Sequence, residues 1–342
     1  MAPRVEKKEV VMPVNNSVLP HDVKKENMHL QTASAKAGAT AAAVDAPPAP
    51  SEKANGDAAS APAFKEWSMH LPRFVNLDTV SKSSPEELKN SYTNPPSTDF
   101  NVRDIGYLSG TKKTTAAPKR PSPTSAYNIV GVNVFRARKS LSHVASKVEE
   151  LKNFIATQGS KDHAEDGMPE FLIVTWMFKS SFKHEYTSVV HLFQRSQTYK
   201  IGDEPGFDRA YENFVRGDDA MRKSKLKFEF KVREAPGALR KSIKMLGGER
   251  PVIIGKALTT HCFEGPNYFE MDQDVGSSYV ASMLNSSILK TSGKIVVDTT
   301  WLVEAQEEAE LPELILGVVR WNYVSLSDVC IELDKDYRPK KD

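Results

Sequence analysis

The most constraining feature of this chain is a series of apolar runs separated by gaps too short for a crossover helix. Residues 171–178 (FLIVTWMF) and 187–194 (TSVVHLFQ) are two such runs, with eight residues between them. Parallel neighbours need a connection of about a dozen residues or more, so this spacing predicts an antiparallel hairpin. Residues 226–232 alternate between apolar and charged side chains, which predicts a strand with one buried and one solvated face.

The rest of the pattern predicts an α+β fold. Further strands are expected at 127–135, 251–258, 267–275, 294–303, 314–324 and 329–333. One helical stripe consists of apolar residues three or four apart, namely Leu141, Val144, Val148, Leu151 and Ile155. Shorter helices are expected at 207–215 and after Ser277 or Ser278. Because most neighbouring strands have hairpin-like spacing, we expect a large, mainly antiparallel curved sheet with helices packed on one face.

Composition divides the chain into three parts. Residues 33–63 contain 14 Ala and 4 Pro and no aromatic residue, so they offer little apolar area to offset the entropy of ordering. We therefore expect segment 1–66 to be a disordered, Ala/Pro-rich N-terminal segment. Residues 67–335 are expected to form a single domain, and residues 336–342 a charged tail.

Charge and hydropathy limit the classes of partner. The net charge of +2 argues against a general nucleic-acid coat, so no nucleic acid is expected. The longest apolar stretch, 171–178, is far shorter than the roughly 20 residues of a transmembrane helix. Two cysteines and the absence of an N-terminal signal pattern favour a cytoplasmic protein, with peripheral attachment to endomembranes or the plasma membrane as an extension of that expectation.

A basic segment is the first candidate site. Between residues 216 and 244 there are ten Lys or Arg and four acidic residues, whereas 304–313 contains five Glu. We expect anionic membrane lipids to be the partners, with their headgroups contacted by Arg222, Lys223, Lys225 and Lys227, and by Lys112 and Lys113 of a basic loop at 109–123. The alternative is an ordinary lysine-rich solvent face.

An acidic strand is the second candidate site. Glu270, Asp272 and Asp274 share one face of the predicted strand 267–275. One interpretation is a site for Mg²⁺ or Ca²⁺. The other is a structural ion pair between Lys256 and Glu270, which would face each other if a hairpin turned near Phe263. The motifs of P-loop, serine-hydrolase and zinc sites are absent, so no cofactor and no enzymatic activity are expected.

Several longer blocks resemble a known family. They are FNVRDIGYLSGTKK (100–113), FVRGDDAMRKSKLKFEFKV (214–232), PVIIGKALTTHCFEGPNYFEMDQDVGSSYVA (251–281) and KIVVDTTWLVEAQEEAELPELILGVVR (294–320). In order and spacing, from about 67 to 335, they resemble the C-terminal domain of the plant enhanced disease resistance 2 proteins. The resemblance implies a regulator of defence and cell death that works at membranes. In plants this domain commonly follows a pleckstrin-homology and a START lipid-binding domain, for which residues 1–66 are too short.

Three functional hypotheses follow from these features. The first is a non-enzymatic, lipid- or membrane-associated regulatory domain. The second is a START-like carrier, since a curved sheet covered by helices can enclose a hydrophobic ligand, here lined by Phe171, Ile173, Trp176 and Phe178. The third is a metal-dependent hydrolase that uses Glu270, Asp272 and Asp274.

Overall fold

The structure is a computed structural model that describes residues 72–109, 117–158, 167–179, 185–245, 248–277 and 289–340. Every described residue belongs to one compact unit, which lies within Ala58–Asp342. The predicted disordered segment 1–66 lies outside the described residues, as do Lys112 and Lys113.

The first of two large sheets, which we call sheet I, has six strands. In spatial order these are β1 (Arg73–Phe74), β2 (Ser91–Thr93), β13 (Ile315–Asn322), β12 (Val296–Val303), β8 (Leu226–Glu234) and β9 (Val252–Ile253). All neighbouring pairs are antiparallel except β1 and β2. The long apolar strands β12 and β13 are central, and the two-residue strands β1 and β9 form the edges, where a short strand limits unwanted pairing.

The second sheet, sheet II, also has six strands. In spatial order these are β10 (Thr259–Gly265), β11 (Tyr268–Asp274), β6 (Phe171–Lys179), β7 (Tyr186–Arg195), β5 (Tyr127–Ala137) and β14 (Ile331–Glu332). β6 and β7 form the predicted antiparallel hairpin. β11 pairs with β6 in parallel, as does β14 with β5. A separate small sheet pairs β3 (Asn101–Arg103) with β4 (Lys119–Pro121).

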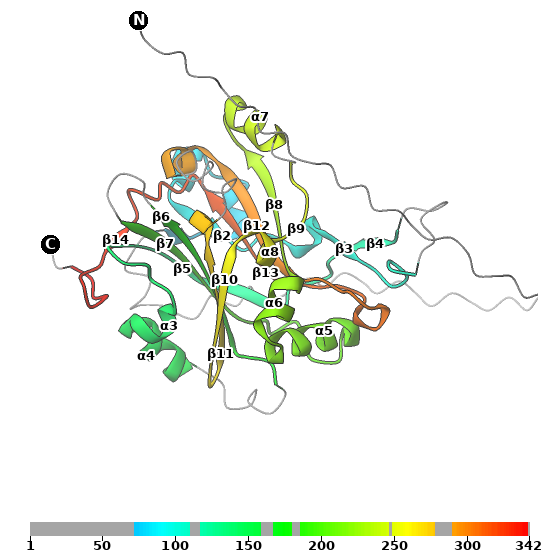
Figure 1. The fold of residues 1–342 in the computed structure, drawn as a ribbon. Coiled ribbons are helices and arrows are strands. Elements are labelled where there is room, and N and C mark those ends of the chain that lie inside the picture. The colour runs from blue at the N-terminus through cyan, green and yellow to red at the C-terminus, as the bar shows by residue number, and fades with distance from the viewer. Residues whose placement is uncertain are drawn as a thin grey trace, which may run out of the picture. The chain divides into compact units, whose positions relative to one another are not determined.

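The two large sheets contribute to one main hydrophobic core (Figure 1). The ring of Trp176 on β6 lies 5.4 Å from that of Trp301 on β12, and Phe193 on β7 lies 5.8 Å from the same Trp301 ring. Gly317 on β13 is required for this packing, because a Cβ at that position would come within 2.7 Å of the Phe193 ring. Sheets I and II therefore pack face to face as the two layers of a sandwich.

Helices cover the other face of sheet II. The predicted stripe from Leu141 to Ile155 is buried throughout, but it is not one helix: Val144 lies in α3 (Val144–Lys147), and Leu151 and Ile155 lie in α4 (Glu149–Gln158). Leu141 precedes α3 and is not helical. Val148 ends α3 in an extended conformation, so the helical path is interrupted there. The Phe154 ring of α4 packs on the Phe171 ring of β6, with 5.6 Å between the ring centroids.

The remaining helices lie along the connections between strands. The α-helices are α1 (Leu77–Val80), α2 (Pro85–Leu88), α5 (Pro205–Arg216), α6 (Asp219–Lys225), α7 (Gly237–Met245) and α8 (Ile254–Ala257). The 3-10 turns are η1 (Ser97–Asp99), η3 (Val275–Ser277), η4 (Ser292–Lys294) and η5 (Glu308–Glu310). α5 confirms the helix predicted at 207–215, and its aromatic residues Phe207, Tyr211 and Phe214 are buried.

The α+β class is confirmed, and two details of the prediction are corrected. The strands divide between two facing sheets rather than forming one large sheet. The predicted strand at 251–258 is only β9 followed by the short helix α8. Gly255 permits this arrangement, because a Cβ there would come within 2.5 Å of the Lys223 carbonyl oxygen. Close packing against α6 therefore overrides the strand-like apolar run.

Candidate functional site

Of the six cations predicted to contact headgroups, four lie in the basic segment 216–244, and three of these four are buried in the domain. Arg222 hydrogen-bonds the carbonyl oxygens of Phe214 and Val215 at the end of α5, and it forms an ion pair with Glu264. Lys225 pairs with Glu310. Of the four residues, only Lys223 is partly exposed. The prediction of an exposed patch at these positions was therefore wrong for Arg222, Lys225 and Lys227.

Lys227 shows most clearly why these cations are internal. Its Nζ lies 2.5 Å from both carboxylate oxygens of Glu313, and the side chains of both residues are almost fully buried. Glu313 also accepts a hydrogen bond from the backbone N–H of Ala305. Burial lowers the pKa of Lys227 even though Glu313 opposes this change. A buried pair of this kind is part of the fold rather than a surface for ligands.

The five glutamates of 304–313 were a signal for this arrangement that the sequence reasoning did not use. Two of them, Glu310 and Glu313, neutralise the lysines on either side of Leu226. The sequence shows both charged segments, but it does not show that the loop after β12 lies over the start of β8.

The carboxyl groups of the acidic strand also have partners within the domain, but Lys256 is not among them. The β10–β11 register places Phe263 opposite Glu270, whereas Lys256 lies in α8 and is exposed. The predicted Lys256–Glu270 ion pair was therefore wrong, because the hairpin is formed by β10 rather than by 251–258.

Backbone N–H groups take the place of a lysine at this strand. The Glu270 carboxylate accepts hydrogen bonds from the N–H groups of Val144 and Ala145 at 2.5 and 3.1 Å. Asp272 Oδ2 accepts from the Ser142 hydroxyl at 2.8 Å and from the His143 N–H at 2.6 Å. Burial, and then the neighbouring Asp272, raise the pKa of Glu270 to about 9, so Glu270 keeps its proton to a higher pH than an exposed glutamate does.

The three acids do not converge on one point. Asp274 accepts a hydrogen bond from the N–H of Gly276, two residues further along its own chain, at 2.8 Å. Within the ranges that the structure describes, no three His, Cys, Asp or Glu side chains are grouped so as to hold a metal ion. Glu270 and Asp272 hold the loop before α3 against sheet II.

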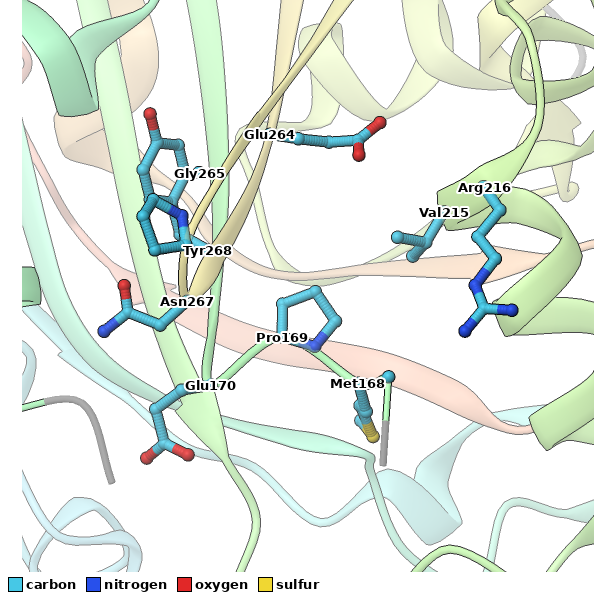
Figure 2. A pocket seen from close by; sticks show the side chains of 11 residues that line it. Met168, Pro169, Glu170, Val215, Arg216, Glu264, Gly265, Asn267 and Tyr268 are labelled. Atoms are coloured by element: carbon cyan, nitrogen blue, oxygen red, sulfur yellow. The ribbon is translucent and has the colours of Figure 1, made fainter. Parts of the chain in front are cut away.

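A polar recess of about 250 Å³ lies where the start of β6, the end of α5 and the β10–β11 turn meet. Figure 2 shows the Glu264 carboxylate and the Arg216 guanidinium on two sides of this recess. Each charged group already has a protein partner: Glu264 pairs with Arg222, Arg216 with Glu212, and Glu170 accepts a hydrogen bond from Gln194. Gln194 engages only one Glu170 oxygen, and the other, Oε2, is buried without a hydrogen-bond partner among the described residues, so the charge of the recess is mostly but not fully satisfied.

A second cavity, of about 270 Å³, is almost wholly apolar. Trp176 and Phe178 of β6 line it from sheet II, and Phe228, Phe230 and Val232 of β8, with Val297 and Thr299 of β12, line it from sheet I. The lining is completed by Ala235, Leu239, Ile243, Ile254, Leu258, Val275 and Ile295. Among these described residues, Thr299 alone has a polar side chain. We call this cavity the intersheet cleft.

A smaller cavity of about 70 Å³ adjoins the intersheet cleft. The two share Trp176, Phe178, Ile295, Val297 and Thr299, so one apolar surface continues from one into the other. The rings of Trp176 and Phe228 lie 5.4 Å apart in the lining. Protein interiors are normally close-packed, so an apolar cavity of this size between two sheets is a feature that requires an explanation.

The strand period explains which predicted lining residues are correct. Trp176 and Phe178 line the intersheet cleft, as the sequence predicted for a carrier. Phe171 and Ile173 have odd numbers on the same strand, so they point to the opposite face and pack under α4. The alternation of β8 assigned its two faces correctly, because its apolar residues Phe228, Phe230 and Val232 face the cleft. The predicted solvation of the charged face was wrong, since Lys227 and Glu229 on that face are buried.

No helix among the described residues is long and apolar enough to cross a membrane.

Comparison with known proteins places these features in a family. The family model described as "Protein ENHANCED DISEASE RESISTANCE 2, C-terminal" matches residues 92–325. A protein of Arabidopsis thaliana named "Protein ENHANCED DISEASE RESISTANCE 2-like" is 36% identical over 127 residues, which cover 37% of this chain and 17% of that relative. No solved structure matches the chain. The family match spans both large sheets from β2 to β13, so the chain belongs to the family of enhanced disease resistance 2 C-terminal domains.

Proposed function

We propose that this domain is a non-enzymatic binding module that holds the apolar part of a lipid-like molecule in the intersheet cleft. The observation that carries this proposal is the cleft itself, a cavity of about 270 Å³ with an almost entirely apolar lining between two otherwise tightly packed sheets. Ligand sites in proteins have volumes of about 300–1,000 Å³ and are lined mainly by hydrophobic and aromatic side chains. The larger cavity together with its 70 Å³ neighbour fits the lower end of that range.

The chemistry of the lining favours a hydrocarbon chain or an apolar ring system. Burying each methylene group contributes about 0.8 kcal/mol, so a medium-length chain gains affinity without any hydrogen bond to the protein. The half-buried Phe228 and Phe230 supply aromatic surface on one side, and Trp176 supplies it on the other. A polar headgroup would remain outside the apolar cleft, because burial without a hydrogen-bond partner is costly.

Of the three hypotheses drawn from the sequence, this proposal corresponds to the second, the START-like carrier. Three residues of the predicted headgroup patch cannot contact lipids, because they form ion pairs inside the domain: Arg222, Lys225 and Lys227. The acids predicted for a hydrolase are engaged with backbone N–H groups instead. Neither the description of the matching family nor the name of the relative refers to an enzymatic activity. A peripheral position on cytoplasmic membranes stays a prediction, which a lipid-binding role would fit.

Native mass spectrometry with dodecanoic acid tests the proposal. The full-length wild-type protein should retain one molecule of the acid. Val297→Phe adds bulk at a position that lines both cavities and should abolish retention. Val252→Phe is the matched control, because Val252 is 44% exposed on the neighbouring edge strand and does not line the cleft.

The folding of each variant is checked by its thermal midpoint. If Val297→Phe does not fold, Phe230→Trp enlarges a half-buried lining residue and replaces it in the test. A wild-type protein that retains no acid at saturating concentration would refute the proposal. Equal retention by wild type and by the folded, filled variant would refute the cleft as its site.

A further inference from the structure

The helix α7 lies at one end of β8 (Figure 1), where it forms part of the wall of the intersheet cleft. Leu239 and Ile243 are one helical turn apart, and both line the cleft. Its charged residues Arg240, Lys241 and Lys244 are all exposed. The helix thus has an apolar face toward the cavity and a cationic face toward solvent, with no acidic residue in its sequence.

The cations of α7 differ from those predicted on the neighbouring segment. Lys225 and Lys227 are neutralised by buried glutamates, whereas Arg240, Lys241 and Lys244 form no ion pair with any residue in the described ranges. Arg240 donates a hydrogen bond to the Arg233 carbonyl oxygen at 2.8 Å, which leaves its charge uncompensated. The positive charge of the basic segment is therefore presented to solvent at the cleft wall.

The acids nearest along the chain do not neutralise this face. Glu234 accepts a hydrogen bond from the Tyr323 hydroxyl, and Glu249 accepts one from the Val232 N–H at 3.0 Å. Arg233 is directed to Asp99 and Asp298 on the other side of sheet I. A surface of exposed cations beside apolar residues is complementary to an anionic membrane, whose headgroups attract the charges and whose acyl region accepts the apolar side chains.

We infer that α7 is a docking surface for anionic lipid bilayers. Lys241 and Lys244 contact the headgroups, and Leu239 and Ile243 then exchange their contacts with the cleft for contacts with the bilayer. This exchange opens the cleft toward the membrane, so that a lipid-like ligand enters without crossing water. The inference rests on the proposed function, because the route has a purpose only if the cleft binds a ligand.

Sedimentation with vesicles tests the docking step on the full chain. Wild type should bind vesicles of phosphatidylcholine with phosphatidylserine in preference to phosphatidylcholine alone, and more weakly as salt is raised. The double variant Lys241→Glu, Lys244→Glu should lose binding by roughly tenfold or more, given the contribution of each basic residue near an anionic surface.

A matched charge reversal provides the control. Lys152 lies on α4, which covers sheet II, and Lys335 follows β14; both lysines are exposed. Lys152→Glu, Lys335→Glu changes the net charge equally and should bind the phosphatidylserine vesicles as wild type does. Equal loss in both double variants would show an effect of net charge alone and would overturn the inference, as would full binding by the α7 variant.

Retention of dodecanoic acid in vesicle-free solution separates this inference from the proposed function. The α7 variant should retain the acid as wild type does, since Lys241 and Lys244 do not line the cleft. If wild type retains the acid but ignores the vesicles, only the inference about α7 fails. If wild type binds the vesicles without retaining the acid, docking is supported, and the proposed function and the entry route fail.

Discussion

At the scale of single residues, the position of a charge matters more than the charge of its segment. Lys227 and Lys223 lie four residues apart in the same basic stretch, yet Lys227 is 5% exposed and paired with Glu313, whereas Lys223 is partly exposed. Lys227→Met should lower the free energy of unfolding by about 3 kcal/mol, because the buried Glu313 carboxylate loses its nearest cation and keeps only the more distant Arg103, at 3.8 Å. Urea denaturation measures this change.

Lys223→Met is the matched control for that prediction. It removes the same functional group from a partly exposed position, and we expect a change within about 0.5 kcal/mol. Similar, small losses in the two variants would contradict a buried, stabilising role for Lys227.

Glu270 predicts a pH dependence of stability. Its pKa is raised from 4.5 to about 9 in the folded protein, so between these values the folded chain binds more protons than the unfolded chain. Stability should therefore decrease as pH rises through this window, with a slope of at most about 1.4 kcal/mol per pH unit. Glu270→Gln removes the titrating group and should flatten this dependence in denaturation measured from pH 5 to pH 9.

Asp274→Asn is the comparison for Glu270, because Asp274 lies four residues further on the same strand and is partly exposed. This variant should keep the wild-type slope. If Glu270→Gln also keeps that slope, the pKa of the Glu270 carboxyl group is not raised in the folded protein and our assignment is wrong.

At the scale of elements, period and spacing predicted most strands but not their partners. The hairpin of β6 and β7 follows from an eight-residue gap, and the inward face of β8 follows from strict alternation. The register of β11 could not be predicted, since β10 begins in the sequence Thr259-Thr260-His261, which has little apolar character. The parallel pairing of β11 with β6 joins segments almost 100 residues apart, which no local pattern reveals.

Two glycines in helices provide a test of packing at this scale. A Cβ on Gly206 in α5 would lie 2.0 Å from the Leu311 carbonyl oxygen, whereas a Cβ on Gly237 in α7 would meet nothing within 4 Å. In an open helix, Gly→Ala stabilises by up to about 1 kcal/mol. For Gly237→Ala we expect that gain in the free energy of unfolding, or no change. For Gly206→Ala we expect the free energy of unfolding to fall by several kcal/mol, because the added Cβ forces α5 away from the backbone at Leu311. Thermal denaturation of both variants would decide, and equal midpoints would refute the close contact.

At the scale of the whole domain, the candidate site arises from two sheets that face each other. The sequence indicated Trp176 and Phe178 as lining residues, because they belong to the most apolar run. It did not indicate Val297 or Ile254, since their relation to β6 depends on how sheet I lies over sheet II. A cavity between two sheets depends on the distance between them. The sequence pattern predicts which face of a strand each residue lies on, but it does not predict how far apart the two sheets lie.

The central claim is that a lipid-like chain occupies the intersheet cleft, and tryptophan quenching by bromododecanoic acid tests it most directly. Trp176 lines the cleft and lies 5.4 Å from Trp301, so bromine held there is close to both indoles. We predict saturable quenching in wild type and in Val252→Phe, and its loss in Val297→Phe. Absence of quenching in wild type, or equal quenching in the folded Val297→Phe variant, would contradict the claim.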